Sequence, residues 1–260
     1  MNTNRAWPQI VAVANQKGGV GKTTTAVNLS CTLALRGKKV LIVDSDPQGN
    51  ASSGVGVRPG KSDRHLYQVL CGNKRVDEAI FPTETTNLFI LPATIDLVAA
   101  ELELTNEEDR ETFTKKALSN LGSPFDYVII DCPPSLGLLT INALTAAHAV
   151  LIPMQCEYFA MEGLAQLINT VRSVKKAFNP DLYICGLLLT MFDTRNKLSH
   201  QVSSEISRHF GDQVFKTIIP RNVRLSECPS HGQTIVAYDP KSTGAVAYTA
   251  LASEFLSKQR

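Results

Sequence analysis

The chain has 260 residues, of which 43% are hydrophobic and 19% are charged, and its formal net charge is +2. A chain of this length buries enough surface for a large core without a disulfide or metal, and its ordinary composition excludes disordered, collagen-like and coiled-coil classes. The small net charge also excludes a protein that is basic over its whole surface.

Short apolar runs alternate with helical patterns along the whole chain. The predicted strands are residues 10–14, 40–43, 88–91, 127–130, 150–152, 183–189 and 214–219. Near-continuous hydrophobic strands separated by helices are typical of a parallel sheet that is covered on both faces. The predicted fold class is therefore α/β, a doubly wound and mostly parallel sheet with helices on both faces. Because no internal repeat or linker is visible, we expect one domain over residues 1–260.

The first predicted helix follows the first strand. Ala26, Leu29 and Leu33 have helical spacing, and Arg36 with Gly37 suggests a basic last turn closed by a C′ glycine.

A glycine-rich turn lies between this strand and this helix. It contains Lys17, Gly18, Gly19, Val20, Gly21, Lys22, Thr23 and Thr24. Backbone N–H groups in such a turn point at phosphate oxygens, and the helix N-terminus adds partial positive charge. In this pattern Lys22 reaches the β- and γ-phosphates, and the Thr23 hydroxyl holds Mg²⁺. The general motif requires glycine where this chain has Gln16, so the loop has the deviant Walker A form with a second lysine, Lys17, at its front.

Two acidic segments follow predicted strands, where open α/β sheets bind their ligands. Asp46 follows residues 40–43, and Asp131 follows residues 127–130. We assign Asp131 to Mg²⁺ coordination through water, in the Walker B role. Asp46 is the candidate for activating the attacking water and a further candidate metal ligand. Each acid alone could instead cap a helix or a turn.

These motifs make the chain similar to the ParA/Soj family of chromosome and plasmid partitioning ATPases, whose deviant Walker A class also includes MinD-type proteins. The resemblance covers nearly the whole chain and is carried by residues 14–24, 44–50, 131–135, 155–160 and 219–224. It implies an ATP-dependent homodimer in which Lys17 of each protomer reaches the phosphates held by the other. It also implies slow hydrolysis supported by Asp46, and an adenine site near Pro220, Arg221 and Asn222.

The same resemblance implies that the ATP-bound dimer binds double-stranded DNA without sequence preference. By the same resemblance, a ParB/Spo0J-type partner would stimulate hydrolysis and release of the protein from DNA. Because the dimer would bind DNA, we expect a cytoplasmic, nucleoid-associated protein. Only nine residues precede the first strand, so we expect no N-terminal helix-turn-helix domain of the kind found in some plasmid members.

Charge is distributed unevenly along the chain. Residues 170–224 hold nine bases and four acids, a net charge of +5. Arg195, Lys197 and Arg224 are the candidate DNA-binding residues of this segment, since several cations facing phosphates suffice for non-specific binding. Arg221 could serve either DNA or the nucleotide, and the segment could also be a solvated basic face. Residues 77–112 have a net charge of −9 and form either a partner surface or a solvated face.

An amphipathic pattern ends the chain. One helical face of residues 245–260 carries Tyr248, Leu251, Ala252 and Phe255. A membrane-targeting helix needs a more basic polar face, so we expect this helix to dock against the sheet, without stable membrane association. The longest mostly apolar run, residues 182–192, is too short to span a membrane.

Three other functions remain to be distinguished. An iron–sulfur ATPase would need cysteines placed symmetrically at a dimer interface, and only Cys132 lies in a suitable loop among the six cysteines. A GTPase would carry Asn-Lys-x-Asp where this chain reads Thr190-Met191-Phe192-Asp193, which favours adenine. A MinD-like positioning protein that recruits a protein assembly without binding DNA would need the same ATP-switched dimer, so the sequence separates it poorly.

Overall fold

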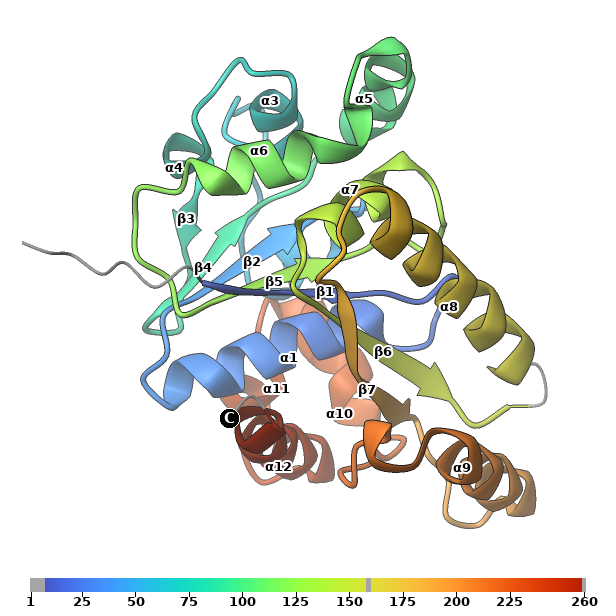
Figure 1. Ribbon diagram of the computed structural model, residues 1–260. Coiled ribbons are helices and arrows are strands. Elements are labelled where there is room, and N and C mark those ends of the chain that lie inside the picture. The colour runs from blue at the N-terminus through green and yellow to red at the C-terminus, as the bar shows by residue number, and fades with distance from the viewer. Residues whose placement is uncertain (1–7, 158–159, 259–260) are drawn as a thin grey trace, which may run out of the picture.

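The computed structural model describes residues 8–157 and 160–258, and Figure 1 shows a central sheet between two layers of helices. The strands are β1 (Gln9–Val13), β2 (Val40–Asp44), β3 (Phe81–Pro82), β4 (Leu88–Leu91), β5 (Tyr127–Asp131), β6 (Ala149–Gln155) and β7 (Tyr183–Thr190). Their order across the sheet is β3-β4-β2-β5-β1-β6-β7. All pairs are parallel except β3 with β4, which confirms the predicted fold class.

The helices fill most of the connections between strands. They are α1 (Lys22–Leu35), α2 (Asn50–Gly54), α3 (Leu66–Leu70), α4 (Val76–Ala79), α5 (Leu97–Glu103), α6 (Phe113–Ser119), α7 (Leu138–Ala146), α8 (Ala160–Ala177), α9 (Lys197–Phe210), α10 (Val223–Glu227), α11 (Ile235–Tyr238) and α12 (Thr243–Lys258). Short 3₁₀ turns include η4 (Cys228–His231). As predicted, Gly37 follows α1 in the left-handed region, but Arg36 lies just beyond the last turn, where its guanidinium bonds Thr249 and Ser253 of α12.

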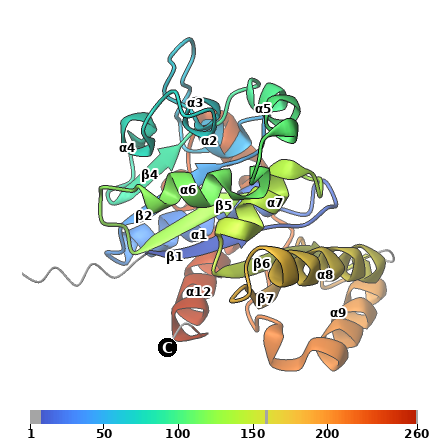
Figure 2. The same cartoon turned by 45° about the horizontal axis from the view of Figure 1, so that its top comes forward.

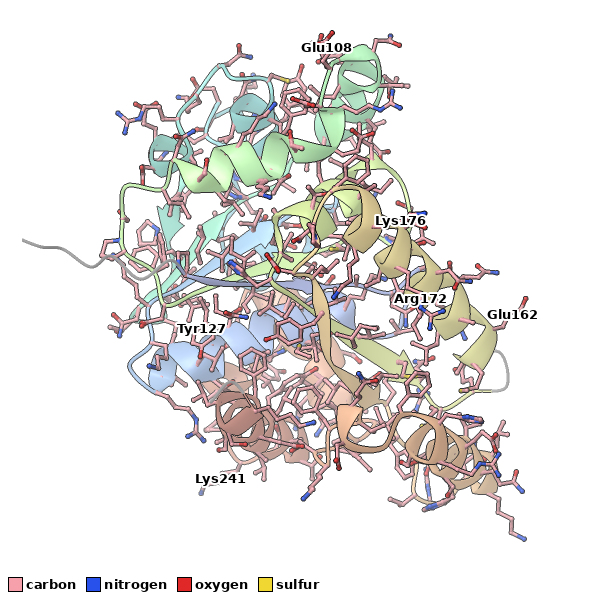
Figure 3. The ribbon with its side chains drawn as sticks, in the orientation of Figure 1. Glu108, Tyr127, Glu162, Arg172, Lys176 and Lys241 are labelled. Atoms are coloured by element: carbon pink, nitrogen blue, oxygen red, sulfur yellow. The ribbon has the colours of Figure 1, made fainter. Side chains whose placement is uncertain are left out.

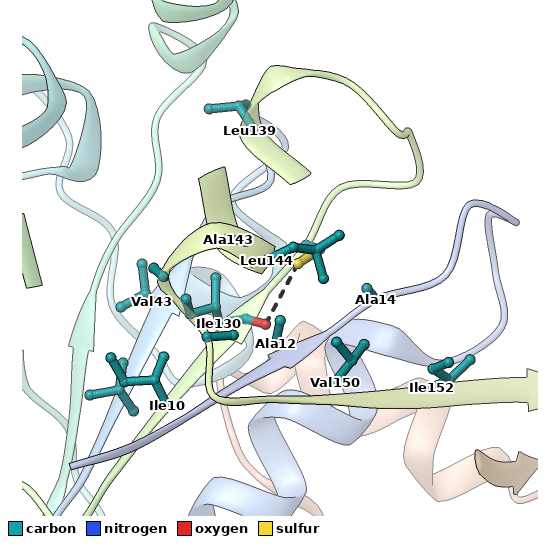
Figure 4. Packing of buried hydrophobic residues seen from close by; sticks show 14 of the residues in the cluster. Ile10, Ala12, Ala14, Val43, Ile130, Leu139, Ala143, Leu144, Val150 and Ile152 are labelled. Atoms are coloured by element: carbon teal, nitrogen blue, oxygen red, sulfur yellow. Dashed lines mark hydrogen bonds between the residues drawn. The ribbon is translucent and has the colours of Figure 1, made fainter. Parts of the chain in front are cut away.

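Each face of the sheet has its own core, because successive side chains of a strand point to opposite faces. Ile10 and Ala12 of β1 pack with residues of α7 and α8, whereas Val11 and Val13 pack with residues of α1 and α12. Figure 4 shows the first of these cores, where Leu139 and Leu144 of α7 lie over the strands.

The segment 214–219, predicted as a strand, is not one. It makes one isolated bridge to the sheet, Leu187–Val214, and a second, Phe192–Pro220, follows one residue past its end. The backbone N–H groups of Lys216 and Thr217 donate to the Glu254 carboxylate of α12, at 2.7 and 2.8 Å. These bonds take the donors that a strand would need for a continuous ladder. The edge strand β3, which the sequence analysis did not predict, is two residues long and includes a proline.

The C-terminal helix docks as expected. Tyr248, Leu251, Ala252 and Phe255 are all buried. The hydroxyls of Tyr248 and of Thr25 in α1 form a hydrogen bond of 3.1 Å. The rings of Phe255 and of Tyr127 in β5 pack edge to face, with their centroids 5.7 Å apart. No helix in the described part of the chain is long and apolar enough to cross a membrane.

Candidate functional site

The glycine-rich loop joins β1 to the N-terminus of α1. Gly19 and Gly21 have φ of 74° and 86°, a region that side chains rarely adopt, and Gly21 caps α1. Asn15 fixes the start of the loop, because its side chain accepts a hydrogen bond from Lys17 N at 3.0 Å and donates to Pro153 O at 2.8 Å. The loop is therefore held open by its backbone geometry and tied to the neighbouring strand β6.

Lys22 is buried in this loop, with only 6% of its surface exposed. Its ammonium donates to the backbone carbonyl of Lys17 at 3.0 Å and so links the two ends of the loop. Burial lowers the pKa of Lys22, while Asp131 and Asp46 oppose the change. A cation in this position, beside exposed backbone amides and a helix N-terminus, suits a polyphosphate.

Asp131 lies at the carboxyl end of β5 and is completely buried. Neither of its carboxylate oxygens has a hydrogen-bond partner. The Thr23 hydroxyl is close enough to oppose the rise in its pKa, but the geometry falls short of a hydrogen bond. Burial, with a further contribution from Asp44, raises the pKa of Asp131 well above its ordinary value. A buried carboxylate without a partner indicates a missing ligand, and a cation or its water shell fits the donor set.

Asp44 was not among the predicted site residues, although it also ends a strand. It pairs in register with Asp131 across β2 and β5 and is completely buried. Ser52 donates twice to its Oδ2, from the backbone N at 2.8 Å and from the hydroxyl at 2.6 Å. Burial nevertheless raises the pKa of Asp44 to about 6. Its position directly after a buried strand was the signal that could have identified it.

Asp46 lies in the turn that follows β2 and is 8% exposed. Its Oδ1 accepts a hydrogen bond from Gln48 N at 3.0 Å, and its backbone N donates to Asp44 Oδ1 at 3.3 Å. Its charge acts on both Lys22 and Asp131, so the fold brings the loop and the two predicted acids together. No group of three or more His, Cys, Asp or Glu in the described residues could hold a metal by itself. This fits Mg²⁺, which commonly binds through one or two carboxylates, waters and phosphates.

Lys17 is on the exposed side of the loop, where it forms an ion pair with Glu157. The two side chains are 42% and 48% exposed, so the pair is weak and its lysine is available to another partner. An open hollow of about 550 Å³ lies beside it, lined by Gln16, Lys17, Ser135, Leu136, Glu162, Gly163 and Gln166. Within the motif 155–160, Tyr158 and Phe159 lie outside the described residues.

The predicted adenine residues lie next to the end of β7. Thr190 donates to Val20 O in the loop at 2.8 Å, and Arg221 N donates to Phe192 O at 3.1 Å. Pro220 forms a bridge with Phe192, two residues beyond Thr190, so the end of β7 and the residues after it contact both the phosphate loop and the predicted adenine segment. Asn222 has a structural role as well: its side chain caps α10 through Arg224 N and donates to Thr243.

The predicted DNA-binding cations lie at the start of α9 and α10. Arg195 is 88% exposed and pairs with Asp193 at 3.1 Å, while Arg224 is 53% exposed and pairs with Glu227 and Asp239 at 2.9 and 3.6 Å. Lys197, the first residue of α9, is exposed. Arg195 lowers the pKa of Asp193, and Arg221 adds to that effect, so these two arginines share one region of the surface.

Cys132 follows Asp131 in the sequence and is buried. Its thiol points to Ile130 O at 3.9 Å, the dashed line in Figure 4, and burial raises its pKa. A buried, protonated thiol is a poor ligand for an iron–sulfur cluster.

A parallel sheet with a glycine-rich loop after β1 and a buried acid after β5 defines a P-loop nucleotide-binding protein of the deviant Walker A type. Residues 8–184 match the family described as AAA domain. The chain is 56% identical to the sporulation initiation inhibitor protein Soj of Bacillus subtilis, over 95% of this chain and 97% of that protein. It is 51% identical to the chromosome partitioning protein ParA of Myxococcus xanthus, over 98% and 91%. The chain therefore belongs to the ParA/Soj family of chromosome partitioning proteins.

One solved structure with a different name is similar as well. It is a Mycobacterium smegmatis protein described as cobyrinic acid a,c-diamide synthase with bound ADP and magnesium. Its TM-score is 0.84 at 40% identity, over 96% of this chain and 94% of that one. The identity is lower than to the partitioning proteins, so the likeness supports the fold and the nucleotide class.

Proposed function

We propose that this chain is a partitioning ATPase that binds Mg-ATP in the loop of residues 17–24 and hydrolyses it slowly. The observation that carries the proposal is Asp131, a fully buried carboxylate without a partner beside Thr23 and Lys22. The glycine-rich loop, its capping of α1 and the family membership support the phosphate site. One sheet contains every strand of the described residues, which supports a single ATPase domain.

The residues of the site have separate tasks in this proposal. The loop amides and Lys22 bind the β- and γ-phosphates, while Thr23, Asp131 and Asp46 hold Mg²⁺ directly or through water. Mg²⁺ supplies neutralisation of the charge that develops on the phosphates. Asp46 orients the attacking water, and Pro220, Arg221 and Asn222 lie near adenine. Because Asp46 is the one group assigned to the attacking water, slow turnover is expected until a partner, a ParB/Spo0J-type protein, completes or reorders the site.

We propose further that ATP brings two protomers together across the hollow beside Lys17. There each Lys17 would leave Glu157 and reach the phosphates held by the other protomer. The paired ends of α9 and α10 would then present Arg195, Lys197 and Arg224 to DNA phosphates, which places the protein on the nucleoid. Each arginine must exchange a weak exposed ion pair for a phosphate contact, a small cost.

The first experiment measures binding to a mixed-sequence DNA duplex with ATP, ADP or no nucleotide, over a salt series. We expect binding with ATP alone, falling steeply with salt. Each of the variants Arg195→Ala and Arg224→Ala removes two cations from the dimer, so each should weaken binding and reduce the salt slope by about two. The matched control is Lys115→Ala, which removes an exposed charge on α6, at the other end of the molecule. If no nucleotide state binds DNA while ATP still drives dimerisation, the protein is a MinD-like positioning protein instead.

A further inference from the structure

Two side chains at the ends of neighbouring strands hold the backbone of the phosphate loop, residues 17–24. Thr190, the last residue of β7, donates from its hydroxyl to Val20 O at 2.8 Å. Gln155, the last residue of β6, donates from its side-chain amide to Gly19 O at 3.3 Å. Figures 1 and 2 show β6 and β7 side by side, as their parallel pairing requires. Two consecutive peptide groups of the loop are therefore bonded to the sheet.

The direction of these two carbonyl groups sets the direction of two N–H groups. A trans peptide group is planar, so its C=O and N–H bonds point to opposite sides. All peptide bonds of the described residues are trans. Gly19 C=O shares a peptide group with Val20 N–H, and Val20 C=O shares one with Gly21 N–H. Both N–H groups therefore point away from the ends of β6 and β7.

Neither of these N–H groups has a hydrogen-bond acceptor within residues 8–157 and 160–258. Val20 is only 1% exposed, so water has little access to it. Buried backbone N–H groups in folded proteins are nearly always paired. Two neighbouring donors without an acceptor indicate a missing ligand with acceptor oxygens. The buried ammonium of Lys22, in the same loop, makes an anion the fitting class of ligand.

Met191 joins the two holding side chains to the loop. It follows Thr190 and has a φ of 49°, a left-handed conformation that is uncommon for residues other than glycine. Gln155 donates to its Sδ as well as to the loop. A Cβ placed on Gly21 would lie 3.6 Å from Met191 Cε, the ordinary distance of a packing contact. Strained backbone persists where its surroundings fix it, and it clusters at functional sites. The turn after β7 is therefore held in place by its contacts with the loop and with β6.

We propose that Thr190 and Gln155 are positioning residues that preorganise the phosphate loop for the phosphates of ATP. By holding two carbonyl groups against the strand ends, they aim the N–H groups of Val20 and Gly21 at phosphate oxygens before ATP binds. A loop prepared in this way binds more tightly, because its peptide groups need not turn on binding. Thr190 has the larger effect, since its hydrogen bond is shorter and buried, whereas Gln155 is half-buried. The inference rests on the proposed function, because it concerns the loop that binds ATP there.

The first test measures equilibrium binding of two probes with Mg²⁺: a fluorescent ATP analogue, and inorganic tripolyphosphate, which has no base. Thr190→Val removes the hydroxyl donor and keeps the shape of the side chain. It should weaken binding of both probes at least about tenfold, the effect of one hydrogen bond to a charged group. Thr190→Ser should bind within about twofold of wild type, since it keeps the donor. Gln155→Ala should weaken binding about threefold, because the bond that it removes is longer and half-buried.

Two control variants match these changes. Thr32 is a buried threonine of α1 whose hydroxyl donates to Asn28 O at 2.8 Å, so Thr32→Val removes a similar bond away from the loop. Lys176→Ala removes an exposed cation of α8, labelled in Figure 3, and controls for unspecific attraction of the anionic probes. Both variants should bind both probes as wild type does. Thermal unfolding shows which variants are folded, and if Thr190→Val is not, Gln155→Ala decides the test.

Three outcomes of this test would overturn the proposal. Unchanged binding by Thr190→Val would show that the bond to Val20 O does not prepare the loop. Equally weak binding by Thr190→Ser and Thr190→Val would assign the effect to the shape of the side chain. Weaker binding of the ATP analogue with unchanged binding of tripolyphosphate would place Thr190 at the nucleoside instead.

The second test separates binding from chemistry in phosphate release. N–H groups that contact phosphate both before and during the reaction stabilise both states equally. Thr190→Val should therefore raise KM and leave kcat within about twofold of wild type. A kcat that falls while KM stays unchanged would assign Thr190 to the chemical step and overturn the positioning role.

The third test needs no nucleotide, so it is independent of the proposed function. In amide NMR spectra of the nucleotide-free protein, Thr190→Val should shift the signals of Val20 and Gly21, because their peptide groups turn. Thr190→Ser and Thr32→Val should leave these signals in place. Unchanged signals in Thr190→Val would overturn the proposal. Wild type that binds neither probe, while the signals shift in Thr190→Val, would refute the ATPase function and uphold the holding of the loop by Thr190.

Discussion

Asp44 and Asp131 stand side by side in register at the carboxyl ends of β2 and β5, and both side chains are completely buried. Burial raises the pKa of both carboxyl groups, and the charge of Asp44 raises the pKa of Asp131 further. Only Asp44 has hydrogen bonds to offset the cost, from Ser52 and from Asp46 N. The protein therefore keeps an unfavourable charge arrangement at the place where we propose that Mg²⁺ binds.

This arrangement makes the stability of the nucleotide-free protein depend on pH. Asp44 has a pKa of about 6 in the folded protein against an ordinary value of 3.8, so folding favours its neutral form. The penalty is absent below pH 4, grows as pH rises to about 6 and is constant above; the difference corresponds to about 3 kcal/mol. The pKa of Asp131 is raised as well, mainly by burial, so its charged form carries a penalty of the same sign. Asp131→Asn should remove that penalty, raising the free energy of unfolding at pH 8 by about 1–3 kcal/mol and by less at pH 5.

Chemical denaturation at both pH values measures this effect. Asp126→Asn, at an exposed acid one residue before β5, is the control and should show no such pH dependence beyond the loss of its own bond to Lys39 N. Equal stability of wild type and Asp131→Asn at pH 8 would show that the carboxylate is not destabilising. Activity should be lost in Asp131→Asn in either case.

Lys22→Ala should abolish productive ATP binding. The ammonium now bonds only the Lys17 carbonyl among the described residues, and that bond is available for exchange with phosphate oxygens. Charge-assisted hydrogen bonds contribute about 1.5–3 kcal/mol each, so the loss should exceed tenfold in affinity. Equilibrium binding of a fluorescent ATP analogue measures it, and tight Mg-ATP binding by this variant would contradict the assignment.

Asp46→Ala should bind ATP and slow its hydrolysis at least about a hundredfold, since general-base groups contribute about 10²–10⁴ in rate. The carboxylate lies near Lys22 and Asp131, but within the described residues it accepts a hydrogen bond from Gln48 N alone. The backbone of Asp46 bonds Asp44 Oδ1 and Gly49 N. The variant should therefore accumulate as an ATP-bound dimer. Phosphate release measured with and without DNA is the assay, and an undiminished rate would remove Asp46 from the catalytic role.

Glu157→Gln should make ATP-dependent dimerisation easier. In the protomer Glu157 holds Lys17, and the proposed dimer requires that lysine to leave. An exposed pair of this kind is worth about 0.2–1 kcal/mol, so the ATP concentration at half-dimerisation should fall about two- to fourfold. Lys17→Ala is the opposite control, expected to bind ATP but to stay monomeric in sedimentation. A dimer formed by Lys17→Ala with ATP would refute the bridging role.

The sequence by itself determined the sheet class and the phosphate loop, because both depend on local patterns. A buried parallel strand needs a continuous apolar run, and the loop needs glycines at the positions where φ is positive, at Gly19 and Gly21. The acids at strand ends were also predictable, since carboxyl ends of parallel strands meet at one edge.

Other features depend on contacts between residues far apart in the sequence, and only the tertiary structure decided these. Residues 214–219 have the composition of a strand, yet Glu254 takes their backbone donors from the other end of the chain. Asp44 and Asp131 are 87 residues apart, and only the β2–β5 register shows that they share one buried site. The acidic segment was ambiguous for the same reason: which faces of α5 are buried or exposed, and which loops it touches, depends on packing between distant elements that no local pattern encodes.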